Sequence, residues 1–198
     1  MTYYTLSDPC AATLEIKKSQ FLGFGIAIDS REQLMFHVEQ LRNQYPDARH
    51  VCYGYIIGDP HNTTSAGFDD DGEPSGTAGR PILNVLQHKG IGNCVVIVVR
   101  YFGGIKLGAG GLTRAYSSTA QGVVDNMNLH AFVPLSVILI ETDFANESFV
   151  RHTLDGFKAT ILKVDYGKNV VLTVELAQKS VQALSEKIGF YGTVKASE

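Results

Sequence analysis

CVVIVVRYFGGIKLGAGGLTRAY, residues 94–116, is the stretch that decides the fold of this chain. Its first six residues are continuously apolar and mostly β-branched, which predicts a central strand that is buried on both faces and ends at the polar Arg100. A glycine-rich loop follows, and beyond Gly110-Gly111 apolar residues recur at helical spacing as far as Met127. The stretch therefore predicts a strand, a loop and a long helix within an α+β domain.

Charged residues are segregated around this stretch. The acidic residues Asp70, Asp71 and Glu73 stand in a loop upstream, and residues 74–124 contain no Asp or Glu. The same interval carries five basic residues, which are Arg80, Lys89, Arg100, Lys106 and Arg114. An ordinary surface mixes the two signs of charge, so this separation marks a candidate site.

The composition is that of a globular protein. Of the 198 residues, 44% are hydrophobic and 19% are charged, which is enough apolar material for packed cores and too little charge for disorder. The net charge of −3 argues against nucleic-acid binding over the whole surface, because that mode needs many Lys and Arg contacts with phosphates. Any nucleic-acid partner must therefore meet a local basic patch.

Cysteine usage and hydropathy favour the cytoplasm. Cys10, Cys52 and Cys94 are odd in number and far apart, which predicts neither a disulfide framework nor a zinc site. No apolar run approaches the roughly 18 residues of a membrane helix, and the N-terminus lacks the pattern of an export signal. We expect a cytoplasmic protein with neither a membrane nor a disulfide partner.

The first domain is predicted to span residues 1–133. Alternating apolar residues predict a hairpin of strands over Ala12–Lys17 and Phe21–Ile28, and a third strand over Val51–Ile57. One helix is expected between Ser30 and Pro46, and another from an N-terminal cap at Thr77 through Gln87.

A second domain is predicted over residues 134–198, because glycine becomes sparse beyond Pro134. Its expected strands are Leu135–Thr142, Thr160–Asp165, Val170–Leu176 and Tyr191–Lys195, and its expected helices are Glu147–Phe157 and Ser180–Ile188. The resulting order βαββαβ is that of the ferredoxin-like, split-βαβ unit.

The glycine loop and the helix start that follow Arg100 are suited to an anion. Gly108, Gly110 and Gly111 let the backbone approach a ligand, and the free N–H groups of a helix start point outward. Phosphate is the expected guest. The alternative is that these glycines only allow tight turns.

Side chains near this loop complete the candidate nucleic-acid or phosphate site. Lys106 and Arg114 can add charge-assisted hydrogen bonds, and Arg80 and Arg100 supply further positive charge. Tyr101 is a candidate for stacking on a base.

The acidic loop allows two interpretations. The carboxylates of Asp70, Asp71 and Glu73 suit magnesium or calcium, but they lack the register of an EF-hand. We favour either a solvated turn or structural pairing, in which an Asp of this loop binds Arg100 and holds the acidic and basic loops in register. We predict no metal and no cofactor, and no catalytic residue is assigned because no triad or nucleophile elbow is visible.

Two segments resemble the signature of the IMPACT/YigZ family. They are DDGEPSGTAGRP at residues 70–81 and VVRYFGGIKLG at residues 98–108, in the order and spacing of that family. IKKSQF at residues 16–21 and DARH at residues 47–50 are similar to the family as well.

The resemblance implies a first domain like domain 2 of ribosomal protein S5, an α/β sandwich, and a second like the ferredoxin-like domain V of translocating elongation factors. It also implies a role in translation regulation, because eukaryotic relatives restrain the amino-acid-starvation kinase pathway. The family brings no established catalytic residues.

The sequence leaves three functions open. The first, which we favour, is a non-enzymatic regulator of translation that binds RNA, the ribosome or a translation-associated protein through the basic glycine-rich loop. The second is a nucleotide-binding phosphotransferase of the small-molecule-kinase type, in which the acidic loop would hold magnesium. The third is a regulator that contacts another protein without nucleic acid.

Overall fold

The computed structural model describes residues 3–196, so the outermost residues of the two predicted domains lie outside the described part of the chain. The chain divides into two compact units between Phe132 and Val133. Both units combine helices with sheets, which confirms a two-domain α+β fold. Within the described residues, no helix is long and apolar enough to cross a membrane.

The first unit is built on a five-stranded sheet. Its strands are β2 (Cys10–Ile16), β3 (Ser19–Ala27), β4 (His50–Asp59), β5 (Asn62–Asp69) and β6 (Cys94–Tyr101). They lie in the order β2-β3-β6-β4-β5, and every neighbouring pair is antiparallel. The strand predicted from the apolar run, β6, is therefore central.

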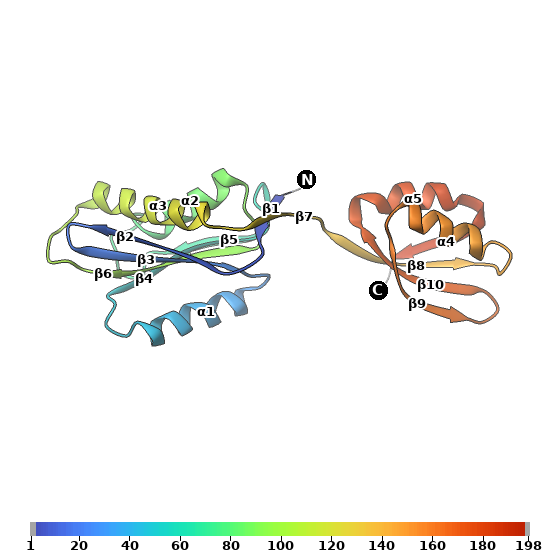
Figure 1. Cartoon of the computed structure of the whole chain (residues 1–198), viewed down its shortest axis with the longest axis horizontal. Coiled ribbons are helices and arrows are strands. Elements are labelled where there is room, and N and C mark those ends of the chain that lie inside the picture. The colour runs from blue at the N-terminus through green and yellow to red at the C-terminus, as the bar shows by residue number, and fades with distance from the viewer. Residues whose placement is uncertain (1–2, 197–198) are drawn as a thin grey trace. The chain divides into compact units, whose positions relative to one another are not determined.

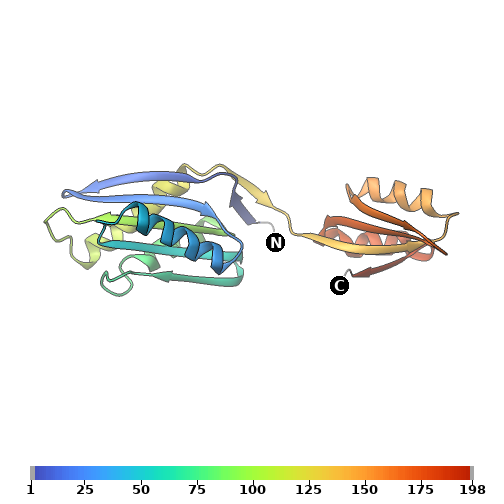
Figure 2. The same cartoon turned by 90° about the horizontal axis from the view of Figure 1, so that it is seen from below.

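Helices cover both faces of this sheet. Helix α1 (Arg31–Gln44) lies on one face, and α2 (Gly79–Lys89) and α3 (Ala109–Asp125) lie on the other (Figure 1). When the unit is seen from below, α1 crosses in front of the sheet (Figure 2). This three-layer arrangement explains why β6 is apolar at every position from 94 to 99, since both of its faces are buried.

Side chains of β6 alternate between two cores. Val96 and Val98 pack in the core beneath α2 and α3, whereas Ile97 and Val99 pack in the core beneath α1. Because a strand has a period of two, Arg100 continues the α2/α3 side. The next residue, Tyr101, packs on the α1 side.

Three strands of the first unit were not predicted from the sequence. Strand β5 is an edge strand with mostly exposed side chains, so it lacks the apolar alternation that would predict it. Strands β1 (Tyr3–Leu6) and β7 (Leu129–Phe132) are four residues each and pair with one another. Their pairing joins the two ends of the unit, and the rings of Tyr3 and Phe132 stack with centroids 4.8 Å apart.

The second unit follows the predicted order of elements. Its strands are β8 (Leu135–Thr142), β9 (Thr160–Tyr166), β10 (Val170–Ala177) and β11 (Thr193–Ala196), its helices are α4 (Glu147–Gly156) and α5 (Val181–Ile188), and short 3-10 helices span Gln178–Ser180 and Gly189–Tyr191. The strands form one antiparallel sheet in the order β11-β8-β10-β9. Helices α4 and α5 lie on the same face, over a core of aliphatic side chains (Figure 1).

A close approach between β4 and α2 gives a first prediction. A Cβ added at Gly54 would lie 2.5 Å from the backbone nitrogen of Leu83 in α2, which the backbone cannot easily relieve. We expect Gly54→Ala to lower the free energy of unfolding of the first unit by at least about 2 kcal/mol. The measurement is urea unfolding of the whole chain, with amide exchange assigning the transition to the unit.

The matched control is Gly122→Ala in α3. A Cβ there would lie 3.4 Å from the Cβ of Ala12, an ordinary contact, and alanine favours a helix over glycine by about 1 kcal/mol. Gly122→Ala should therefore be neutral or stabilising. An equal loss for both variants would contradict the packing argument.

Candidate anion-binding site

Asp70 caps the start of α2 from the acidic loop. Its carboxylate accepts hydrogen bonds from the backbone nitrogens of Gly76 at 2.6 Å, Ala78 at 3.0 Å and Gly79 at 2.8 Å. The prediction that Thr77 caps this helix is wrong, because its hydroxyl donates instead to the backbone oxygen of Pro74. Free N–H groups at a helix start are satisfied here by a residue nine positions upstream.

Asp71 holds the same loop against β4. Its carboxylate accepts from the backbone nitrogen of Val51 at 2.6 Å and from the Arg42 guanidinium at 2.8 Å. Its backbone oxygen lies 2.7 Å from Nδ1 of His50. Since a carbonyl oxygen can only accept, Nδ1 of His50 carries the proton in this contact.

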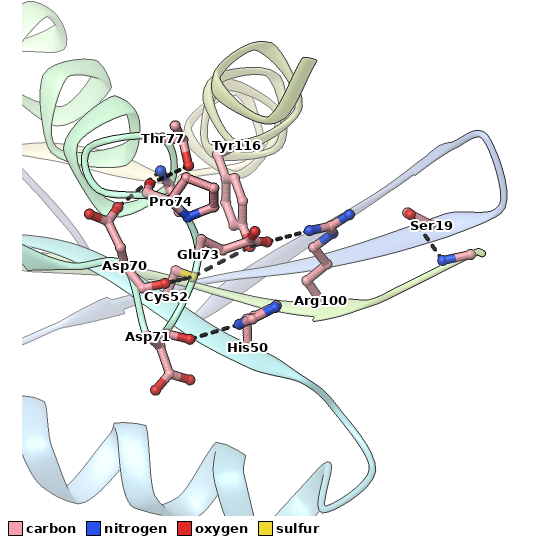
Figure 3. Close-up of polar contacts among 12 residues, drawn as sticks. Ser19, His50, Cys52, Asp70, Asp71, Glu73, Pro74, Thr77, Arg100 and Tyr116 are labelled. Carbon is pink, nitrogen blue, oxygen red and sulfur yellow. Dashed lines mark hydrogen bonds and ion pairs between the residues drawn. The ribbon is translucent and has the colours of Figure 1, made fainter. Parts of the chain in front are cut away.

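Glu73 supplies the buried partner of Arg100. Its Oε1 lies 2.5 Å from Nη1 of Arg100 and accepts from the hydroxyl of Tyr116 at 2.8 Å (Figure 3). The side chains of Glu73 and Arg100 are only 4% and 6% exposed, so this ion pair is part of the core. The acidic and basic loops do pair, as expected, but the partner of Arg100 is Glu73 rather than an Asp.

The three carboxylates of the acidic loop point in different directions (Figure 3). Each is engaged by amides or guanidinium groups, which is structural pairing, one of the two arrangements that we favour from the sequence. Within the described residues, no three His, Cys, Asp or Glu side chains gather as a metal site would require.

Tyr116 and Cys52 complete the buried network as hydrogen-bond donors. Burial raises the pKa of the Tyr116 hydroxyl, and the neighbouring Cys52 and Glu73 raise it further. Burial likewise raises the pKa of the Cys52 thiol, whose sulfur lies 3.0 Å from the backbone oxygen of Asp70. Both groups therefore stay protonated at neutral pH, and Cys52 is unsuited to act as a nucleophile.

A pocket of about 390 Å³ opens above this network at the start of α3. It brings together four of the candidate residues, Glu73, Arg100, Lys106 and Gly108, and adds others that the sequence analysis did not select. The lining residues are Arg49, His50, Glu73, Pro74, Arg100, Phe102, Lys106, Leu107, Gly108, Ala109 and Leu112.

Among the charged side chains of this pocket, basic ones outnumber the single acidic one. Arg49 and Lys106 are exposed and make no ion pair with any described residue. The guanidinium carbons of Arg49 and Arg100 lie 5.9 Å and 5.8 Å from the ring centroid of Phe102. Within the described part of the chain, the buried Nε of Arg100 has no hydrogen-bond partner.

The start of α3 faces this pocket without a side-chain cap. Gly108 is the N-cap residue at φ +70°, a conformation that favours glycine, and it has no side chain to accept a bond. The first N–H groups of the helix are consequently free of a side-chain partner. Together with the helix dipole, they favour an anion at this position.

The remaining candidate residues do not line the pocket. Tyr101 packs on the α1 side of the sheet, and Arg80 is exposed at the start of α2. Gly110 and Gly111 lie in the first turn of α3, where a Cβ on Gly110 would be 3.7 Å from Nη1 of Arg114. The Arg114 side chain therefore reaches back along α3 toward its first turn.

Strand register explains how His50 reaches the pocket. His50 pairs directly with Arg100 across β4 and β6, so both side chains belong to the same face of the sheet. Neither His50 nor Arg49 was selected as a site residue from the sequence. Their position within DARH, next to the predicted third strand, is the signal that was available.

Comparison with known proteins gives consistent matches over most of the chain. The Impact N-terminal domain matches residues 17–124, and a domain of unknown function (DUF1949) matches residues 140–189. IMPACT family member YigZ of Escherichia coli (strain K12) is 35% identical over 180 residues, which are 91% of this chain and 88% of that protein. A crystal structure described as a hypothetical protein is 32% identical with a TM-score of 0.73, covering 100% of this chain and 98% of that one. The solved structure of the two-domain translational regulator Yih1 is 25% identical with a TM-score of 0.35, covering 63% of this chain and 47% of that one.

The fold and the site define a two-domain α+β protein whose first domain carries a basic pocket at a helix start. The pocket and its acidic loop lie within the matched residues 17–124. The chain belongs to the IMPACT family.

The buried ion pair gives a second prediction. Glu73→Gln leaves the Arg100 guanidinium buried without a counter-charge, so we expect it to lower the free energy of unfolding of the first unit by about 3–5 kcal/mol. Urea unfolding with amide exchange at β6 measures this loss. Arg42→Gln, which removes the half-exposed pair with Asp71, is the control and should cost less than about 1 kcal/mol. Similar losses for the two variants would show that burial of the Glu73–Arg100 pair is unimportant.

Thiol reactivity gives a third prediction. Cys52 and Cys94 are fully buried and burial raises the pKa of both thiols, whereas Cys10 is partly exposed. In native protein at pH 8, we expect Cys52 and Cys94 to react with a thiol reagent at least about a hundredfold more slowly than in urea. A Cys10→Ser variant isolates the two buried thiols. Rapid native reaction in this variant would contradict the packing around them.

Proposed function

We propose that this chain is a non-enzymatic regulator of translation that binds RNA, free or within the ribosome, through the basic pocket and the adjoining glycine loop. One observation carries the proposal: the exposed cations Arg49 and Lys106 stand beside the uncapped start of α3. Unpaired basic side chains and free backbone N–H groups are the donors that proteins use to hold nucleic-acid phosphates.

Family membership supports the translational part of the proposal. Regulation of translation is what the family resemblance implies, and the description of Yih1 gives that role to Yih1. A translation-associated protein that carries RNA is a compatible partner. The cytoplasm is the proposed location, and the free thiols of Cys10, Cys52 and Cys94 fit a reducing compartment.

The unit architectures support the proposed fold assignments. The order βαββαβ with strands arranged β11-β8-β10-β9 supports a ferredoxin-like second domain. For the first domain, the family resemblance supports an assignment to the class of ribosomal protein S5 domain 2. Both assignments agree with a protein of the translation apparatus.

Salt-dependent binding gives a fourth prediction. The variant Arg49→Ala/Lys106→Ala/Arg114→Ala removes three exposed cations, so its affinity for single-stranded RNA should fall and depend less on salt. The slope of log K against log salt concentration should decrease in magnitude by about 2, since each phosphate contact in single strands contributes about 0.7. Arg100 is left intact because its substitution would disturb the core.

The matched control removes the same charge from outside the site. Arg31→Ala/Arg42→Ala/Lys89→Ala changes three other basic side chains of the first unit and should leave the slope nearly unchanged. Fluorescence anisotropy between 50 and 200 mM salt is a suitable measurement, because binding through several phosphate contacts weakens strongly over about that range. Equal slopes for the two triple variants, or no binding by the natural chain, would rule out RNA binding by this pocket.

A further inference from the structure

We propose that the pocket at the start of α3 receives the terminal phosphate of an RNA strand, a phosphomonoester, rather than a phosphodiester within the strand. This inference rests on the proposed RNA-binding function and specifies which part of the RNA enters the pocket. Three features lead to it: the charge of the pocket, its unsatisfied donors and its closed floor.

The charge of the pocket matches a dianion. Three basic side chains line it, and its carboxylate Glu73 is bound to Arg100 and Tyr116. Arg49 and Lys106 remain as a surplus of two positive charges. A phosphomonoester carries a charge of about −1.5 to −2 near neutral pH, whereas a phosphodiester within a strand carries about −1.

Within the described part of the chain, donors without a hydrogen-bond partner occur in the wall of the pocket and at the start of α3. The Arg100 side chain is 6% exposed, lines the pocket and has an Nε without a hydrogen-bond partner among the described residues. The free N–H groups at the start of α3 lie beside it, at Gly108 and Ala109. A terminal phosphate has three non-bridging oxygens to offer these donors, whereas an internal phosphate has two.

The floor of the pocket is closed by buried groups. Glu73 and Arg100 are each less than a tenth exposed, and Glu73 accepts hydrogen bonds from both Arg100 and Tyr116 (Figure 3). The volume of about 390 Å³ fits one terminal nucleotide, and the half-exposed ring of Phe102 and the side chain of Leu107 give it apolar walls.

The test compares RNA octamers that differ only at their ends. Calorimetric titration of the full chain would use one unstructured sequence with a 5′-phosphate, with a 3′-phosphate or with hydroxyl groups at both ends, and AMP as a free mononucleotide. We expect one of the two phosphorylated octamers to bind at least about tenfold more tightly than the hydroxyl-ended octamer, the factor that corresponds to one added charge-assisted contact. AMP should bind more weakly than that octamer, because it lacks the strand.

Single variants locate the effect. Arg49→Ala and Lys106→Ala change exposed side chains, so both should fold, and each should reduce the preference for the phosphorylated end to less than about threefold. Lys89→Ala, at the end of α2, is the control and should retain the full preference.

The outcomes separate this inference from the proposed function. Equal affinity for phosphorylated and hydroxyl-ended octamers would overturn the terminal-phosphate inference while leaving RNA binding intact. A preference that survives both single variants would also overturn it. If AMP bound as tightly as the phosphorylated octamer, the ligand of the pocket would be a free nucleotide, and the inference of an RNA end would be overturned. If no octamer bound at low salt, the proposed function itself would be overturned.

Discussion

Burial of the Arg100 guanidinium in the core of the first unit requires the carboxylate of Glu73. An unpaired charge at 6% exposure would be strongly destabilising, while the paired groups contribute little net stability after desolvation. The pair matters mainly through what it fixes. It joins the acidic loop to the central strand β6, and through Tyr116 it also joins both to α3. The floor of the pocket is thus made by three segments that are distant in the sequence.

The acidic loop acts as a clamp whose charges are used within the protein. Asp70 holds the start of α2, Asp71 holds the start of β4, and Glu73 holds β6 and α3. Because these carboxylates bind backbone groups as well as side chains, the acidic loop does not neutralise every basic residue that follows it in the sequence. Arg100 is neutralised, but Arg49 and Lys106 are left without ion pairs among the described residues. The pocket is therefore basic because the fold supplies a carboxylate to Arg100 but none, among the described residues, to Arg49 or Lys106.

Local patterns predicted the regular elements, whereas the site needed information on register. The apolar run before Arg100 identifies β6, and the spacing of apolar residues beyond Pro134 reproduces the bounds of β8. Arg100 and Tyr101 were both predicted to belong to the site. They lie on opposite faces of the sheet, because neighbouring side chains alternate along a strand. The pairing of His50 with Arg100 depends on how β4 and β6 align, and a single strand carries no signal of that alignment. Strand β5 was missed because an exposed edge strand loses its apolar alternation.

Glycine is needed in the basic loop for more than one physical reason. Gly103 is needed for packing, because a Cβ there would lie 2.0 Å from the backbone carbon of Lys18, and Gly104 and Gly108 adopt positive φ. Gly110 shares neither property: its φ is not in the left-handed region, and the nearest atom to an added Cβ is the mobile Nη1 of Arg114 at 3.7 Å. Glycine in a helix costs about 1 kcal/mol relative to alanine. Neither packing nor backbone conformation requires glycine at position 110, in contrast to positions 103, 104 and 108.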